Sequence, residues 1–169
     1  MMLPDVVFHM RVRDESVEGE NPYRWDLKTT RELFGGKRVL IFGLPGAFTP
    51  TCSNNQLPTF EKMAQEFYNK GIDEIWCTSV NDAFVMHQWG LSQNLKEVKL
   101  LPDGSGHFAR GLDMLVEKDN LGFGLRSWRY ALIADDLKIE VFSEEEVPMH
   151  NCPTDPYEKS KPEHVITLL

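Results

Sequence analysis

The residue with the clearest capacity for chemistry is Cys52, which ends the segment 45–52 (PGAFTPTC). Thr49 can cap a helix and Pro50 suits its first position, so Cys52 is predicted to lie in the first helical turn after a buried strand. Unpaired backbone N–H groups and the positive end of the helix dipole favour the thiolate there. Because the thiolate is the nucleophilic form, the segment predicts a reactive cysteine. Gly46 lets the backbone approach a bound oxygen closely.

Composition limits the class of protein. The three cysteines, at 52, 77 and 152, include no Cys-x-x-Cys pair, which excludes a secreted disulfide framework and a thioredoxin-type dithiol. A formal net charge of −8 argues against a nucleic-acid partner, which would require a basic face. No apolar run approaches the roughly 20 residues of a membrane span, and the first residues lack the pattern of a signal peptide. We therefore expect a cytoplasmic protein with one domain, residues 1–169.

The elements around Cys52 indicate an α/β protein. Residues 6–27 are predicted to form a hairpin, after which Thr29 and Glu32 form the capping box of a short helix. The apolar run 38–43 is typical of a central strand covered on both faces. The helix that follows the reactive loop is expected to reach about residue 69, with a kink or a break at Pro58.

The second half of the chain continues this pattern. A buried strand at 74–80 precedes a helix that Asn81 or Asp82 can cap. The remaining predicted elements are a strand at 98–101, a helix at 107–114, a hairpin at 128–142 and a last helix from Pro162. The acidic run 144–146 indicates a solvated turn. Together these elements predict a mixed β-sheet with helices on both faces.

Three separated motifs resemble one known family. Residues 45–52 are similar to the active-site signature of peroxiredoxins, and their PGAFTP form resembles the atypical type 5, or type II, branch. Residues 80–86 (VNDAFVM) and 121–130 (LGFGLRSWRY) resemble the same branch. Residues 122–130 look most like the peroxiredoxin part of bacterial peroxiredoxin–glutaredoxin fusions. The resemblance implies a thioredoxin-like fold and a thiol peroxidase that reduces hydrogen peroxide and organic hydroperoxides.

The resemblance also implies roles for individual residues. Cys52 matches the peroxidatic cysteine, Thr49 the active-site hydroxyl and Pro45 the proline that shields the site. Arg129 matches the arginine that stabilises the thiolate and the developing charge, and Arg126 is its rival for that role. The implied peroxide-binding set is Gly46, Thr49, Cys52 and Arg129. Catalysis through a sulfenic acid requires no metal, flavin or haem.

The regeneration of Cys52 is open at this point. Cys77 is expected to be a buried bystander in a strand, although plant type II enzymes carry a resolving cysteine at this position. Cys152 is the other candidate, because animal type 5 enzymes place a resolving cysteine roughly there and its proline-containing segment is expected to be mobile. We expect an external reductant, glutathione or a glutaredoxin, with thioredoxin as the alternative that an internal disulfide would favour. The family also implies a homodimer through the face around the active-site loop.

Other functions compete with peroxide reduction. The same sulfenic acid serves a peroxide sensor or redox relay, which would pass its oxidation to a partner protein. A thiol oxidoreductase without peroxidase activity would need a second active-site cysteine, which is missing. His87 could act as the base of a cysteine hydrolase, but no feature of the sequence pairs it with Cys52.

Overall fold

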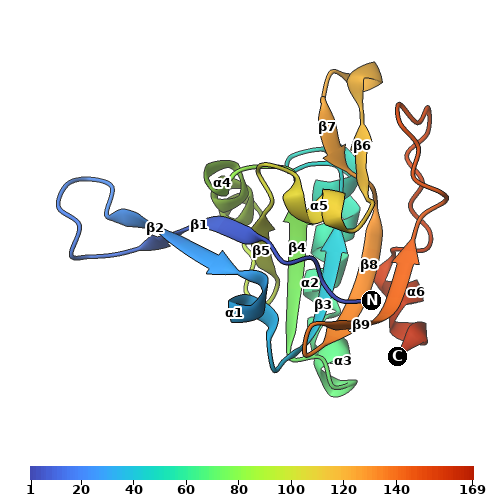
Figure 1. The fold of residues 1–169 in the computed structure, drawn as a ribbon, viewed down its shortest axis with the longest axis horizontal. Coiled ribbons are helices and arrows are strands. Elements are labelled where there is room, and N and C mark those ends of the chain that lie inside the picture. The colour runs from blue at the N-terminus through green and yellow to red at the C-terminus, as the bar shows by residue number, and fades with distance from the viewer.

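The computed structural model describes residues 1–169, and its centre is a five-stranded sheet with the order β5-β4-β3-β8-β9 (Figure 1). The strands are Arg38–Gly43 (β3), Glu74–Ser79 (β4), Lys99–Pro102 (β5), Tyr130–Asp135 (β8) and Lys138–Glu144 (β9). β3, β4 and β5 run parallel, whereas β8 pairs antiparallel with both β3 and β9. The prediction of a mixed sheet is confirmed. β3 lies at its centre because its apolar residues suit a strand covered on both faces.

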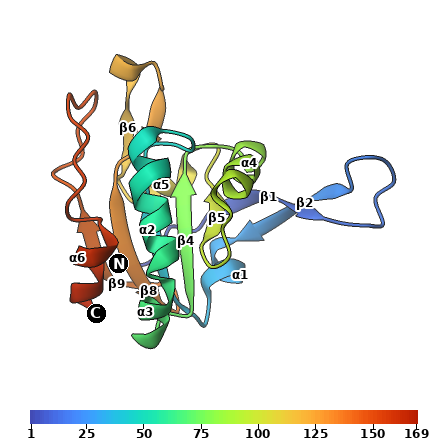
Figure 2. The same ribbon diagram turned by 180° about the vertical axis from the view of Figure 1, so that it is seen from behind.

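Helices cover both faces of this sheet, as predicted. They are Thr30–Phe34 (α1), Leu57–Lys62 (α2), Ala64–Asn69 (α3), Ala83–Gln93 (α4), His107–Gly111 (α5) and Pro162–Val165 (α6). One group of buried side chains joins the sheet to α2, α3, α4 and α6, and a second joins it to α1, α5 and the N-terminal hairpin. Figure 2 shows α2 and α3 in front of the sheet, next to the arrow of β4, on the first of these faces. No helix is long and apolar enough to cross a membrane.

Two hairpins extend from the central sheet. The predicted N-terminal hairpin is present as Val7–Arg13 (β1) paired with Tyr23–Thr29 (β2). A second hairpin, Leu115–Glu117 (β6) with Leu125–Ser127 (β7), was not predicted. Its strands of three residues each are too short to show a two-residue alternation. In Figure 1 this hairpin stands beside the C-terminal segment.

The helix after the reactive loop differs from the prediction. Cys52–Gln56 is a turn of π-helix, and the Leu57 amide donates to the Cys52 carbonyl. α2 begins at Leu57, runs through Pro58 and ends before Met63, so the break falls at Met63 rather than at Pro58. Proline has no N–H to donate and its ring crowds the carbonyl four residues earlier. The wider π-turn accommodates this, and such turns are frequent at functional sites.

The predicted helix starts are confirmed at two positions. Thr29 accepts from the Glu32 amide at 3.1 Å while the Glu32 side chain accepts from the Thr29 backbone, which completes the capping box. Asp82, rather than Asn81, caps α4, since its Oδ1 accepts from the Val85 amide at 2.9 Å. Asn81 is thereby left for another role beside the reactive loop.

Candidate active site

Cys52 lies at the carboxyl end of β3, where the chain leaves the sheet and enters its longest helical stretch. The first helical hydrogen bond runs from the Ser53 amide to the Thr49 carbonyl at 2.9 Å. Cys52 is fully buried, and it packs with Leu44 and Leu57. The amides of Thr51 and Cys52 donate no hydrogen bond within the chain. They are therefore free to bind an oxygen that develops negative charge.

Thr49 does not cap the helix with its side chain as predicted. Its hydroxyl donates to the Gly46 carbonyl at 2.7 Å, and its amide donates to the same carbonyl at 3.4 Å. The hydroxyl therefore closes the turn of the reactive loop. Because it does not accept from the helical amides, those amides remain available to a ligand.

Arg129 contacts the reactive sulfur. Its Nη1 lies 3.3 Å from Cys52 Sγ and donates to Gln56 Oε1 at 2.6 Å. The residue is only 3% exposed. Burial lowers the pKa of Arg129, but the negative charges of Cys52 and Asp155 raise it further, so the net shift is upward. The guanidinium thus remains charged beside a sulfur that reacts as a thiolate.

Asp155 holds Arg129 from the other side, and this contact was not predicted. Its carboxylate accepts from Arg129 Nε at 3.0 Å and from Nη2 at 2.8 and 2.9 Å. Two parallel hydrogen bonds fix both the position and the plane of the guanidinium. The sequence gives no local signal for this pair, because the two residues are 26 positions apart and both β8 and β9 lie between them.

Glu145 fastens the segment that carries Asp155. Its Oε1 accepts from the Glu158 amide at 2.7 Å and from the amide and hydroxyl of Ser160, each at 2.8 Å. Glu145 is 2% exposed, so the prediction of a solvated acidic turn at 144–146 is wrong for its middle residue. Burial raises the pKa of Glu145, but these hydrogen bonds outweigh it and hold the pKa below its ordinary value. Trp128 Nε1 donates to the Glu145 carbonyl at 3.2 Å and closes the same corner.

Arg126, the rival of Arg129, holds the reactive loop instead. It donates to the Pro45 carbonyl and to the Phe123 carbonyl, each at 3.2 Å. A side chain at Gly46 would collide with the Arg126 guanidinium, so this glycine makes room for the arginine. Burial lowers the pKa of Arg126, and the charge of Cys52 opposes that shift. On the other side of the loop, the Ala47 amide donates to Asn81 Oδ1 at 3.0 Å.

Neither of the other cysteines is bonded to Cys52; all three thiols are free. Cys77 is fully buried in β4 and belongs to the same buried group as Cys52. Burial, and then the charge of Cys52, raise the pKa of the Cys77 thiol well above its ordinary value. A thiol held protonated is a poor nucleophile.

Cys152 is more firmly held than we expected of a mobile segment. It is 9% exposed, its carbonyl accepts from Asn120 Nδ2 at 3.2 Å, and the neighbouring Asn151 amide donates to the Glu117 carbonyl at 2.7 Å. These bonds fasten the segment to the β6–β7 hairpin. Cys152 packs in the buried group on the opposite face of the sheet from Cys52.

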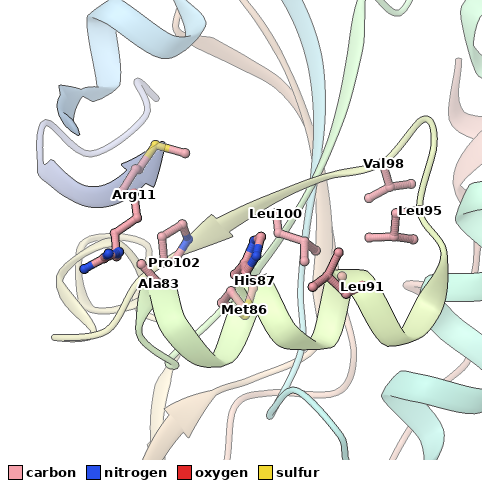
Figure 3. A pocket seen from close by; sticks show the side chains of 11 residues that line it. Arg11, Ala83, Met86, His87, Leu91, Leu95, Val98, Leu100 and Pro102 are labelled. Atoms are coloured by element: carbon pink, nitrogen blue, oxygen red, sulfur yellow. The ribbon is translucent and has the colours of Figure 1, made fainter. Parts of the chain in front are cut away.

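Two cavities show which of the candidate residues lie near the reactive loop and which do not. Pro45, Thr49, Arg129 and Cys152 share the lining of a cavity of about 320 Å³ at the reactive loop. His87 instead lines a pocket of about 280 Å³ between α4 and β5, beside Leu91 and Leu100 (Figure 3). Cys52 is absent from that pocket, so His87 is not placed to act as its base. No group of three or more His, Cys, Asp or Glu gathers that could hold a metal ion.

Two residues of the site, Asp155 and Gln56, were not singled out in the sequence, and both contact Arg129. A third, Asn81, was considered only as a helix cap, whereas it accepts a hydrogen bond from the reactive loop. Asn81 belongs to the motif 80–86, and this motif could have indicated that its side chain contacts the reactive loop. Gln56 lies four positions after Cys52 in the same helical stretch. Residues four positions apart lie on one face of a helix, so this spacing could have indicated Gln56 as a neighbour of Cys52.

Comparison with known proteins now identifies the family. A redoxin family model matches residues 26–158. A peroxiredoxin of Rhizobium etli is 59% identical over 167 residues, which are 99% of this chain and 93% of that protein. The hybrid peroxiredoxin hyPrx5 of Haemophilus influenzae is 40% identical over 99% of this chain and 64% of that protein.

Solved structures agree with this similarity. The antioxidant protein (1-Cys peroxiredoxin) of Plasmodium falciparum has a TM-score of 0.92 and 32% identity, over 99% of this chain and 97% of that one. Reduced Prx3 of Vibrio vulnificus in complex with hydrogen peroxide has a TM-score of 0.83 and 34% identity, over 100% of this chain and 97% of that one. The fold is therefore thioredoxin-like, and the chain belongs to the peroxiredoxin family of thiol-dependent peroxidases.

Proposed function

We propose that Cys52 is the residue that attacks the peroxide and that Arg129 stabilises it. The observation that carries this assignment is the 3.3 Å contact between Arg129 Nη1 and Cys52 Sγ in a fully buried site. Low solvent access strengthens the attraction between guanidinium and thiolate. The thiolate attacks one peroxide oxygen, the O–O bond breaks, and the leaving oxygen departs as water or alcohol after taking up a proton.

The free amides of the reactive loop position the peroxide in this reaction. The Thr51 and Cys52 amides lack partners in the chain, so they can donate to the oxygen atoms on which charge develops. Pro45 lines the cavity at the loop and shields the site. The Thr49 hydroxyl donates its proton to the Gly46 carbonyl, so its oxygen can accept a hydrogen bond from the peroxide.

The sulfenic acid is then reduced by an external thiol, glutathione or a glutaredoxin, rather than by a cysteine of this chain. Two observations support this proposal. The high pKa of Cys77 and its place in the middle of the sheet make it a weak resolving group. Cys152 lines the cavity at the reactive loop, but it is fastened to the β6–β7 hairpin and packs in a different buried group from Cys52. A relative named a 1-Cys peroxiredoxin is consistent with one working cysteine.

Mass spectrometry of the oxidised protein tests the assignment. One equivalent of hydrogen peroxide without reductant should leave Cys52 as sulfenic or sulfinic acid, and added glutathione should give a mixed disulfide at Cys52. Cys152→Ser and Cys77→Ser variants are the matched controls and should give the same products. A quantitative Cys52–Cys152 disulfide, lost in Cys152→Ser together with thioredoxin-driven turnover, would favour an internal resolving cysteine instead.

A homodimer and a cytoplasmic location complete the proposal. Phe48 in the reactive loop is 55% exposed and has a φ of 66°, a strained conformation for a bulky residue. An exposed aromatic side chain held in this way suits burial in an interface around the active-site loop. Sedimentation velocity decides the oligomeric state, and a monomer at all concentrations would refute the dimer. The three free cysteines suit a reducing compartment.

A further inference from the structure

Lys118 is a cation beside the reactive loop that forms no ion pair. It follows β6 and is 3% exposed, yet it takes part in none of the ion pairs of the chain. Its Nζ lies 5.6 Å from the centre of the Trp128 ring, and its amide is fixed to the Gly124 carbonyl at 2.8 Å. Most of the side chain is buried, but Nζ is not among the buried polar atoms that lack a partner, so the ammonium group reaches the cavity at the reactive loop. A negatively charged ligand in this cavity could pair with it.

The side chain lines the cavity at the reactive loop. This cavity of about 320 Å³ is lined by Lys118, Pro45 and Thr49, together with residues 152–155 of the C-terminal segment. Its volume is at the lower end of the range for small-molecule sites. Because Pro45 and Thr49 belong to the loop that carries Cys52, a ligand bound at Lys118 would lie beside this loop.

The charges around the cavity change when Cys52 is oxidised. Asp155 is the one acidic residue in the lining, and its carboxylate is already bound to Arg129. In the reduced enzyme the negative charge of the Cys52 thiolate offsets the positive charge of a second cationic side chain. The sulfenic acid is neutral, so its formation removes one negative charge from a region that holds Arg126, Arg129 and Lys118. An anionic ligand is therefore favoured at the stage at which the reductant arrives.

We propose that Lys118 binds a carboxylate of the thiol that reduces the Cys52 sulfenic acid. The inference rests on the proposed function of Cys52 and names the class of its reductant: a small thiol that carries a carboxylate. In the reaction, the thiol sulfur bonds to the Cys52 sulfur, the S–O bond breaks, and the hydroxyl group leaves with the thiol proton as water. A second thiol then attacks the mixed disulfide on the reductant's sulfur, which releases the Cys52 thiol and a disulfide of two reductant molecules.

Glutathione and its diethyl ester test this site, because the ester carries the same thiol without a free carboxylate. The protein is oxidised with one equivalent of hydrogen peroxide and mixed with either thiol, and the mixed disulfide is followed by mass spectrometry of quenched samples. A hydrogen bond to a charged group is worth roughly 1.5–3 kcal/mol, so glutathione should react about tenfold faster or more relative to the ester. In Lys118→Met the ratio of the two rates should fall about tenfold.

Control variants separate recognition from general effects. Lys96→Met removes an exposed lysine and should keep the parent ratio. Lys118→Arg retains the charge and should keep most of the discrimination. If Lys118→Met does not fold, raised salt applied to the parent protein should lower the ratio, because it screens the ion pair. A ratio that is the same in the parent at low and high salt, or in the parent and Lys118→Met, overturns the proposal.

Two further experiments show which part of the proposal is wrong if the expected ratio is not found. Turnover with dithiothreitol, an uncharged thiol, tests the proposed function alone: its absence would refute Cys52 as the peroxidatic residue, whereas normal turnover without glutathione discrimination would refute only the Lys118 site. The second experiment compares linoleic acid hydroperoxide with its methyl ester as oxidants. If Lys118→Met changes that comparison and leaves the thiol comparison intact, the carboxylate belongs to the peroxide and the reductant assignment is wrong.

Discussion

Replacing Asp155 by asparagine should slow the oxidation of Cys52 about tenfold without unfolding the protein. Asp155 accepts three contacts from Arg129, at 2.8, 2.9 and 3.0 Å, and asparagine keeps one acceptor oxygen but loses the charge and the second. The Arg129 side chain is 4% exposed and that of Asp155 is 48% exposed. Hydrogen bonds to charged groups contribute roughly 1.5–3 kcal/mol, and the solvent at Asp155 weakens this pair to about 1–2 kcal/mol. A loss of 1.4 kcal/mol in the transition state corresponds to about a tenfold lower rate.

Stopped-flow fluorescence gives the rate directly. Trp89 Nε1 donates to Ser53 Oγ at 2.9 Å, so its emission should respond to oxidation at the neighbouring Cys52. The second-order rate constant with hydrogen peroxide is measured for the parent, for Asp155→Asn and for Asp5→Asn, which removes an exposed carboxylate elsewhere. Denaturant unfolding of each variant checks that the fold is intact.

The outcome that refutes this reasoning is specific. If Asp155→Asn is oxidised at the parent rate while Arg129→Gln is slow, the hydrogen bond from Arg129 to Gln56 is sufficient to hold the guanidinium at the sulfur. The ion pair between Arg129 and Asp155 would then stabilise the fold without affecting the oxidation rate of Cys52. If Asp155→Asn lowered the oxidation rate and the unfolding free energy together, the slower oxidation would reflect general destabilisation of the protein and not a displaced guanidinium.

The remaining predictions concern neighbouring groups. Arg129→Gln should slow oxidation of Cys52 by about 100-fold, as expected for the loss of a preorganised donor, whereas Arg126→Gln should have a smaller effect; equal peroxide kinetics in the two variants would refute this ranking. Cys77→Ser should leave the oxidation rate unchanged, which the same assay checks. For Glu145, whose folded-state pKa is lowered, the stabilisation is full above the unfolded value of about 4.3 and is lost as the pH falls through the lower folded value. The stability difference between the parent and Glu145→Gln should therefore be largest near neutral pH and shrink in acid, as measured by urea unfolding.

Much of the fold followed from local patterns in the sequence. The apolar runs of β3 and β4, the capping box at Thr29 and the cap at Asp82 each act within a few residues, so they could be recognised without tertiary information. The misplaced break at Pro58 has a different origin. A proline cannot donate the regular helical hydrogen bond. Whether the helix then kinks or forms a π-turn depends on the packing of the turn before the proline.

The site was predictable only where its residues are adjacent in the chain. Cys52 and the loop before it could be assigned from one segment, and Arg129 from a motif. The ion pair of Arg129 with Asp155 could not be assigned, because Asp155 lies after β9 in a segment without helix or strand whose position depends on the buried Glu145. A run of three glutamates ordinarily indicates a solvated surface. Only the amides that converge on Glu145 from residues 158 and 160 make its burial favourable.

This dependence links the chemistry at Cys52 to the order of the C-terminal segment. Arg129 is buried, and with Asp155 removed from it the guanidinium would keep only Gln56 and the cysteine sulfur as partners. A buried charge with fewer partners tends to move toward water, which would take Nη1 away from the sulfur. Because Glu145 fastens the same segment, a partial opening near Ser160 would have the same effect as a substitution at Asp155. We therefore expect the stabilisation of the Cys52 thiolate by Arg129 to weaken when this segment opens.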